Sequence, residues 1–374
     1  MIVDTLNNKD KISPEERIKI LAISRIKGFG PRRFINCISK FGTIDNLLKE
    51  KKKSLKKFLP GYIVDDLKSK RFLRDIDEYI KELDRKETYY STLFEPNYPR
   101  LLREIYDPPI VLYSKKAFTE SINLDRCFSV VGTRGCSKYG IEVTKKMVRR
   151  LVELDFTIVS GMAFGIDKAA HTEAIKESGK TVAVLSSSVN IPSPMTNIDI
   201  YRNILSNGGS IFSERHLGDD IVSGMFPARN RIISGLSIGT LIVEAGKKSG
   251  ALITARLALE QGREVFAIPA NIYNSKGIGT NNLIKKSGAK LVQDVDDIVE
   301  ELGISFNNDN STKQLLLDDL EKKIVNYLYR GSATIDNISE YLNVDISSLN
   351  QKISILEIEG KVAKVEGNRY VVIK

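Results

Sequence analysis

Between Arg126 and Leu302, short runs of β-branched and aromatic residues alternate with stretches of helical character. Six of these runs are CFSVV, FTIVS, TVAVLS, GSIFSE, TLIVE and EVFAI. Strands that are separated by helices pair in parallel through crossover connections, whereas hairpins need only short turns. The pattern therefore predicts an α/β fold built on a parallel, doubly wound sheet with helices on both faces.

A helical region precedes this sheet. Residues 1–86 show apolar residues at helical spacing, interrupted at Gly28-Phe29-Gly30-Pro31. Two helices around such a turn are typical of a helix-hairpin-helix or SAM-like domain, in which turn amides can hold a phosphate. Six lysines lie between Lys49 and Lys57. Whether this run is a solvated face or a contact to a polyanion stays open at this point.

The chain after the sheet has a different character. We assign residues 87–305 to the sheet domain and the polar segment 306–313 to a linker. Residues 314–374 have the pattern of three helices followed by two short strands around a turn. This order predicts a winged-helix domain.

The charge favours a polyanionic partner. The net charge is +10, and residues 1–120 carry 26 Lys and Arg against 18 Asp and Glu, a difference of +8. Neutralising phosphates releases counterions and drives such binding. The three cysteines form no CxxC motif, and no apolar run approaches the ~18 residues of a membrane span. We expect a cytoplasmic protein with no membrane partner.

Three candidate segments follow predicted strands. Gly132-Thr133-Arg134 follows the first strand and combines a tight turn, a hydroxyl and a guanidinium before a helix, which suits a phosphate. Ser160-Gly161 ends the second strand, where a glycine allows close backbone approach. Arg229-Asn230-Arg231 opens an apolar helix, and two guanidinium forks suit several phosphates along a strand. A purely structural role for these arginines remains the alternative.

Other chemistry is poorly supported. The chain has neither GxGxxG nor GxxxxGK[ST], so neither a standard dinucleotide site nor a P-loop is predicted. Asp167 and His171 lie one helical turn apart and could form an acid-base or metal pair, but no third ligand follows at usable spacing. We interpret this pair as a helix anchor, and we predict no metal, no cofactor and no catalytic residue.

Taken together, the motifs resemble those of the DNA processing protein A family, DprA, also called Smf. The resemblance spans Phe94 to Val292, and it is carried by NYPRLLREIYDPPIVLY, VVGTRGCSKYG, VSGMAFGIDKAAHTEAI, SERHLG, FPARNRIISGLSIGTLIVEAGKKSGALITARLALEQGREVFAIPANI and GTNNLI. It implies an extended Rossmann-like domain that binds single-stranded DNA without sequence preference and is not an enzyme. It further implies loading of the RecA recombinase during natural transformation, and homodimers formed through the Rossmann-like domain.

Carried over by position, the family's DNA pocket involves three segments of this chain. They are the first turn, the end of the second strand and the FPxRNR element, with the residues Gly132, Thr133, Arg134, Ser160, Gly161, Arg229, Asn230 and Arg231.

Two rival functions belong to other classes. Gly239-Thr240 followed by Glu244 resembles a Rossmann-type nucleotide phosphoribohydrolase, although that family's preceding glycine pair is absent. Alternatively, the helix over residues 346–359 reads duplex DNA in a regulator. Glu357 and Glu359 on that helix argue against duplex binding and favour contact with a protein.

Overall fold

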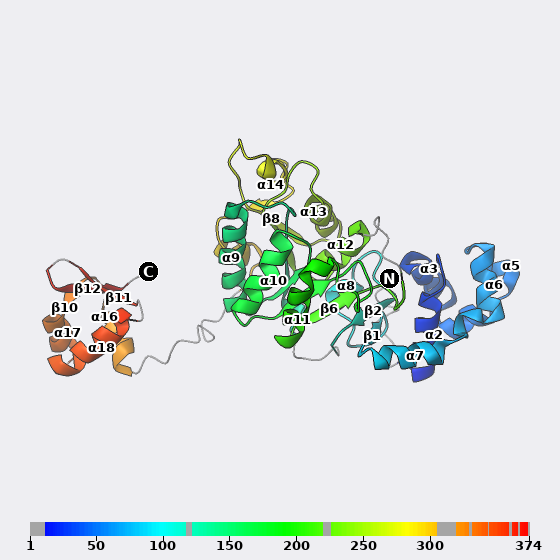
Figure 1. The fold of residues 1–374 in the computed structure, drawn as a ribbon, viewed down its shortest axis with the longest axis horizontal. Coiled ribbons are helices and arrows are strands. Elements are labelled where there is room, and N and C mark those ends of the chain that lie inside the picture. The colour runs from blue at the N-terminus through cyan, green and yellow to red at the C-terminus, as the bar shows by residue number, and fades with distance from the viewer. Residues whose placement is uncertain are drawn as a thin grey trace. The chain divides into compact units, whose positions relative to one another are not determined.

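The computed structural model describes most of the chain, namely residues 12–116, 122–219, 226–304, 319–328, 331–342, 344–358, 361–365 and 367–372. The chain divides into two compact units, residues 1–304 and 305–374 (Figure 1). The predicted linker over residues 306–313 lies outside the described residues. Within the described ranges, no helix has the length and apolar character needed to cross a membrane.

The larger unit is built on a nine-stranded sheet with the order β1-β2-β6-β5-β4-β3-β7-β8-β9. The strands are β1 (Tyr89–Thr92), β2 (Val111–Ser114), β3 (Cys127–Val131), β4 (Thr157–Ser160), β5 (Thr181–Val184), β6 (Ser210–Ser213), β7 (Gly239–Ile242), β8 (Glu264–Ala267) and β9 (Lys290–Leu291). All pairs from β6 to β9 are parallel, while β1 and β2 add an antiparallel edge. The predicted α/β fold with a mostly parallel sheet is confirmed.

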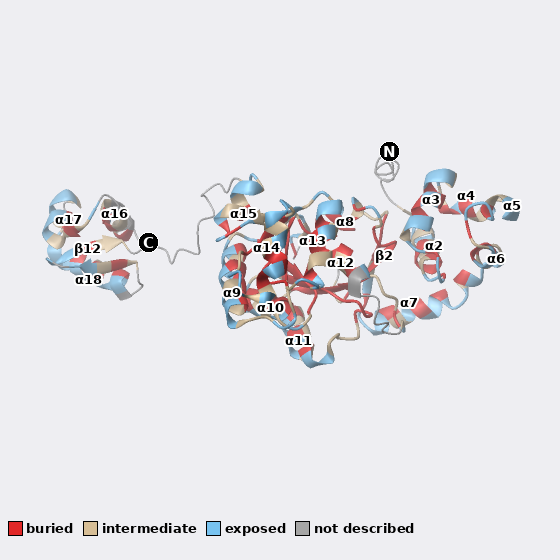
Figure 2. Ribbon diagram, turned by 90° about the horizontal axis from the view of Figure 1, so that it is seen from above, coloured by how far each residue is buried: buried red, intermediate tan, exposed pale blue. Residues whose placement is uncertain are grey.

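Helices cover both faces of this sheet. They are α8 (Arg100–Arg103), α9 (Lys138–Glu153), α10 (Ile166–Lys176), α11 (Ile198–Ser206), α12 (Phe226–Gly235), α13 (Ala251–Glu260), α14 (Ile278–Lys285) and α15 (Asp296–Glu301). Neighbouring residues of β5 belong to different cores, since Ala183 packs in one cluster and Val184 in another. This alternation follows from the two-residue period of a strand. Figure 2 shows the buried strands between helices whose outer faces are exposed.

The winding of the sheet fixes where a ligand can bind. From β3 the chain moves outward through β4, β5 and β6, and it then returns to place β7 beside β3. The connections after β3 and β7 therefore leave in opposite directions. In open parallel sheets, this switch opens a crevice at the carboxyl ends of the strands.

Within the described residues from Ile12 on, six helices precede the sheet. They are α2 (Pro14–Ser24), α3 (Pro31–Phe41), α4 (Ile44–Lys49), α5 (Lys52–Leu55), α6 (Gly61–Ser69) and α7 (Ile76–Arg85). Helix α2 contacts β1 and β2. One hydrophobic cluster joins Ile20 and Phe34 of these helices to Tyr113 and Leu185 of the sheet region. The predicted boundary at residue 86 coincides with the change from helix to strand, but the helical region and the sheet share a core.

The C-terminal unit has its own small core. It contains α16 (Asp319–Leu328), β10 (Ala333–Thr334), α17 (Ile335–Leu342), α18 (Ile346–Ile358), β11 (Val362–Val365) and β12 (Arg369–Val372). The three strands form a sheet in the order β10-β12-β11. Ile324, Ile338, Leu349 and Tyr370 meet in its interior.

His171 on α10 is fully buried in the larger unit. Its Nδ1 lies 2.7 Å from the Thr181 hydroxyl, which itself donates to the Ile158 carbonyl at 2.8 Å. The hydroxyl therefore accepts from His171, which places the ring proton on Nδ1. The buried Nε2 has no hydrogen-bond partner among the described residues. Burial, and secondarily the charge of Arg229, lower the pKa of His171 to about 3.

We predict that this histidine makes the fold less stable in acid. An unfolded histidine takes up a proton near its ordinary pKa of 6.5, whereas His171 does so only near 3. Between these values the unfolded state binds the extra proton, so the free energy of unfolding falls by about 1.4 kcal/mol per pH unit as the pH drops. Urea unfolding over this range measures the slope. His171→Asn should flatten it, and an unchanged slope in this variant would contradict the assignment.

Candidate functional site

The turn after β3 is held by close backbone packing. A Cβ on Gly132 would lie 2.5 Å from Ile166 Cγ1 and 3.0 Å from the Glu244 carbonyl, so only glycine fits there. The amide of Thr133 donates to that same carbonyl at 2.7 Å. Gly165 has a φ of +77°, and a Cβ there would meet the Thr133 carbonyl at 2.3 Å. The first predicted segment is therefore packed between Glu244, which follows β7, and the start of α10.

Glu244, fully buried after β7, anchors the helix that follows this turn. Its carboxylate accepts from the Ser137 amide at 2.8 Å and from the Ser137 hydroxyl at 2.6 Å. A Cβ on Gly140 would lie 2.4 Å from its Oε2. A carboxylate at a helix N-terminus is stabilised by the helix dipole. Sequence reasoning noticed Glu244 only as a possible catalytic group, and its position at the end of a buried strand was the signal for a structural one.

Arg229 joins the carboxyl ends of two strands. Its Nη1 donates to the Gly161 carbonyl at 2.6 Å and to the Val184 carbonyl. The residue is 7% exposed, and burial lowers its pKa, while the nearby charge of Asp167 opposes that shift. This guanidinium is a buried positive charge that fixes the ends of β4 and β5.

Ser160 and Gly161 lie beside Arg229 at the end of β4, and neither offers a side chain to a ligand. The Ser160 hydroxyl is buried and donates to the Val130 carbonyl at 2.7 Å. A Cβ on Gly161 would lie 2.2 Å from Nη2 of Arg229. The glycine therefore makes room for the arginine, and the two predicted residues support the site from beneath.

Asp167, at the start of α10, completes this layer. Its carboxylate accepts from the Gly161 amide at 3.1 Å. Burial raises its pKa, and the charge of Arg229 and the backbone amides that it accepts from, including those of Ala163 and Gly132, counteract the rise. Asp167 therefore acts as a helix anchor. The structure, over the ranges it describes, holds no group of three or more His, Cys, Asp or Glu side chains that could hold a metal ion.

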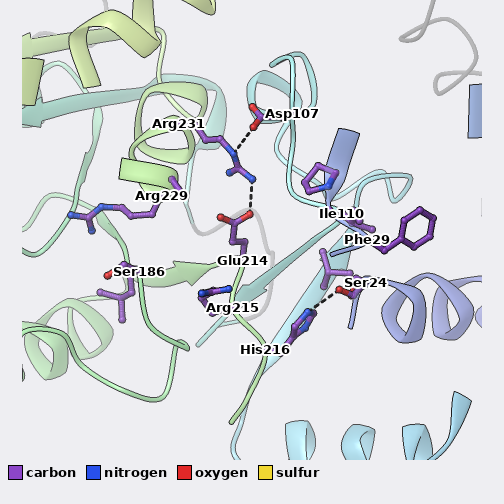
Figure 3. Close-up of a pocket in the computed structure, with 15 residues that line it drawn as sticks. Ser24, Phe29, Asp107, Ile110, Ser186, Glu214, Arg215, His216, Arg229 and Arg231 are labelled. Carbon is purple, nitrogen blue, oxygen red and sulfur yellow. Dashed lines mark hydrogen bonds and ion pairs between the residues drawn. The ribbon is translucent and has the colours of Figure 1, made fainter. Parts of the chain in front are cut away.

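The three residues Arg229, Asn230 and Arg231 lie within α12, which begins earlier than the sequence predicted. Residues two apart on a helix point in different directions. Accordingly, Nε of Arg231 lies 3.1 Å from Asp107 and its Nη2 lies 2.5 Å from Glu214, away from the turn after β3 (Figure 3). Burial lowers the pKa of Arg231, but the two carboxylates raise it overall.

A cavity of about 370 Å³ opens where β3 and β7 end. It brings together five of the eight predicted residues, namely Gly132, Thr133, Arg134, Arg229 and Asn230. Its other lining residues are Val131, Ala163, Asp167, Ile233, Ser249, Gly250, Ala251, Ile253 and Thr254. Ser160, Gly161 and Arg231 do not line it. We call this the switch cavity, because it lies at the topological switch of the sheet.

The switch cavity offers donors to an anion. Arg134 is exposed at its edge, while Arg229 lies buried in its wall. The Ala251 amide at the start of α13 donates to the Ser249 hydroxyl at 3.4 Å, and the Leu252 and Ile253 amides donate to the Ser249 and Gly250 carbonyls at 3.1 and 3.0 Å. This ten-residue helix therefore offers the cavity the positive end of its dipole rather than free amides. Sequence reasoning left Ser249, Gly250 and Thr254 out of the predicted site, although a glycine turn before a helix pointed to them.

Comparisons with known proteins agree with this architecture. The family model of DNA recombination-mediator protein A matches residues 89–303. Protein Smf of Synechocystis sp. is 31% identical over 94% of this chain and 97% of its own length. The DNA processing protein DprA of Streptococcus pneumoniae is 38% identical over 62% of this chain and 80% of its own.

Two solved structures share the fold. The crystal structure of DprA from Streptococcus pneumoniae has a TM-score of 0.65 and 30% identity, and the match covers 79% of this chain and all of that one. DprA from Helicobacter pylori, whose structure concerns a single-stranded DNA binding mode, has a TM-score of 0.50 and 31% identity. That match covers 57% of this chain and 95% of the other.

The different surroundings of the arginines predict different consequences of replacing them. Arg229→Ala leaves the Gly161 and Val184 carbonyls without their buried donor, so the free energy of unfolding should fall by about 3 kcal/mol. Arg134→Ala removes an exposed side chain and should change it by less than about 0.5 kcal/mol. Chemical denaturation of both variants measures the difference. Equal stability of the two proteins would contradict the structural role of Arg229.

Proposed function

This chain belongs to the DNA recombination-mediator protein A family, and from that premise we propose that it binds single-stranded DNA in the switch cavity. The observation that carries the proposal is the gathering of Gly132, Thr133 and Arg134 with Arg229 and Asn230 around one concave site. Guanidinium groups are donors that phosphates prefer in proteins, and the positive end of a helix dipole favours an anion beside it. The single-stranded DNA binding of the Helicobacter pylori relative supports the same ligand.

We assign the direct phosphate contact to Arg134. It is the exposed arginine of the cavity edge, whereas Arg229 is only 7% exposed and lies in the cavity wall. The positive end of the α13 dipole favours a second phosphate of the same strand, and Arg229 contributes its charge from within the wall. Ser160, Gly161 and Arg231 act indirectly in this account, because they position the strand ends and α12.

The shape of the site favours one strand over two. A single strand is flexible, so its successive phosphates can follow a concave surface. A duplex is stiff over a persistence length of about 50 nm and cannot bend into a cavity of this size without cost. Because the proposed contacts go to the backbone, they carry no sequence preference.

We propose that the chain performs no reaction on the DNA. Glu244 is the residue that suggested a phosphoribohydrolase. Both of its carboxylate oxygens accept hydrogen bonds from Ser137. His171 is fully buried and bonded to Thr181. Incubation with nucleoside monophosphates should therefore release no free base, as followed by chromatography. Turnover that disappears in Glu244→Gln would favour the enzyme instead.

The remaining roles are proposed from the family resemblance and the surface. We propose a homodimer through the β9 edge of the sheet, where Leu291 is exposed. Ile272 and Tyr273, which follow β8, are exposed as well. An unpaired edge with apolar side chains is suited to a second copy. We also propose that the chain loads RecA on the bound strand during recombination.

We propose that the C-terminal unit is a winged helix and that it contacts another protein. Its three helices and β-hairpin have the corresponding order, and α18 would be the reading helix of a duplex-binding version. Residues 306–374 carry 9 Lys and Arg against 10 Asp and Glu, a difference of −1. A surface without excess positive charge is poorly suited to a duplex.

Fluorescence anisotropy with labelled oligothymidine tests the proposal. If about four phosphates are neutralised, log K should fall against log salt with a slope near −3, at roughly −0.7 per phosphate. Arg134→Ala should weaken binding by about tenfold and reduce the slope by about 0.7, because one charge-assisted contact is lost. Arg202→Ala removes an arginine that is similarly exposed on α11, outside the switch cavity, and serves as the matched control. Equal losses in the two variants, or equal affinity for duplex and single strand, would count against the proposal.

A further inference from the structure

Helix α3 carries cations along its exposed face. Arg32, Arg33 and Lys40 are all exposed, and the sequence of this helix, PRRFINCISKF, contains no acidic residue. The surrounding chain is similarly basic, since residues 27–62 contain ten Lys and Arg against two Asp and Glu. Such a local excess attracts a polyanion more strongly than the average charge of the protein does.

Three exposed aromatic rings lie against or beside these cations. Tyr106 is 73% exposed, and the guanidinium of Arg32 lies 4.5 Å from its ring centroid. Phe58 is 47% exposed, and Nζ of Lys40 lies 3.6 Å from its ring centroid. The rings come from different segments of the chain, yet both contact one helix.

The third ring is Tyr62, which is 55% exposed. Its hydroxyl lies so close to Gly28 that a Cβ on this glycine would be 2.4 Å away. Gly28, in turn, has a φ of +80°, and its carbonyl accepts from Nη1 of Arg33. Tyr62 therefore lies over the turn that leads into α3, close to the cations at the start of the helix.

Exposed aromatic rings beside cations match the two parts of a nucleotide, namely its base and its phosphate. Proteins that bind single strands use cations for the phosphates and aromatic rings for the bases, because every base has a face that stacks. A charged surface that is merely solvated gains nothing from large exposed rings. A duplex would not use them, because its bases are already stacked on each other.

A second cavity lies between the start of this helix and the switch cavity's wall residue Arg229. It has a volume of about 380 Å³, and it lies between Gly30 and Pro31 at the start of α3 and the strand ends marked by Ser186 and Glu214 (Figure 3). Arg229 lines both cavities. Tyr106 directly precedes Asp107, which also lines the second cavity. The two cavities are therefore neighbours that share Arg229 as a wall.

We propose that the exposed face of α3 is a second binding surface for single-stranded DNA, on which bases stack and phosphates pair with cations. We call it the α3 face, and it consists of Arg32, Arg33, Lys40, Phe58, Tyr62 and Tyr106. The inference rests on the proposed function, because a strand held in the switch cavity continues past Arg229 onto this face. The face lengthens the bound segment and adds no sequence preference.

Strands of two lengths test this proposal by anisotropy. An oligothymidine of about 6 nucleotides fills the switch cavity alone, whereas one of about 25 nucleotides can reach both surfaces. A triple variant, Phe58→Ala, Tyr62→Ala and Tyr106→Ala, should weaken binding of the long strand by at least about tenfold, given the strength of base stacking. Binding of the short strand should remain within about twofold, which also shows that the variant is folded.

The cations are tested separately, with a matched control. A second triple variant, Arg32→Gln, Arg33→Gln and Lys40→Gln, should make the salt slope of the long strand shallower by about 2, at roughly 0.7 per phosphate. The control changes three exposed cations of the same region to glutamine, and these are Arg74, Lys81 and Arg85. If the control has the same effect, general electrostatics explains the data and the α3 face is refuted.

The remaining outcomes separate this proposal from the proposed function. Unchanged long-strand binding in the aromatic variant, or equal loss for both lengths, overturns the α3 face. Arg134→Ala probes the switch cavity alone and should weaken both lengths. If the long strand still binds fully in Arg134→Ala but is lost in the aromatic variant, the α3 face stands and the switch cavity is the part that fails.

Discussion

The buried guanidinium of Arg229 organises the edge of the sheet where ligands can bind. It connects the Gly161 and Val184 carbonyls, which end two neighbouring strands, and its charge is balanced by buried Asp167. An isolated charge in such a place would be costly, so the surrounding groups and the arginine depend on each other. Because the same residue lines two cavities, its position also determines how those cavities adjoin.

The charged side chains around Arg229 form two groups, one buried and one accessible to solvent. Arg229, Asp167 and Glu244 are each at most 7% exposed and contact backbone carbonyls or amides. Arg231 is also 7% exposed, and it pairs with the carboxylates of Asp107 and Glu214. Arg134 lies exposed in front of them. A layer that is fixed in advance lowers the cost of ordering a site when a ligand binds.

The sequence predicted the parallel sheet, and it placed the segments Gly132 to Arg134 and Arg229 to Arg231 after strands of that sheet, because both follow from local patterns. Strand runs alternate with helices, and loops after parallel strands meet at one edge, so Gly132 to Arg134 and Arg229 had to lie near each other. Which arginine reaches solvent could not be predicted. That depends on partners such as Asp107 and Glu214, which lie 124 and 17 residues from Arg231 along the chain. The shared core of the helical region and the sheet was similarly hidden, because it arises from contacts between distant segments.

A crystal structure of this chain with oligothymidine is the most direct measurement of the central claim. We expect a backbone phosphate within about 3 Å of the Arg134 guanidinium and a neighbouring one beside the N-terminus of α13. We also expect that Arg229 keeps its contacts with the two carbonyls. DNA bound elsewhere, with the switch cavity empty, would contradict the claim.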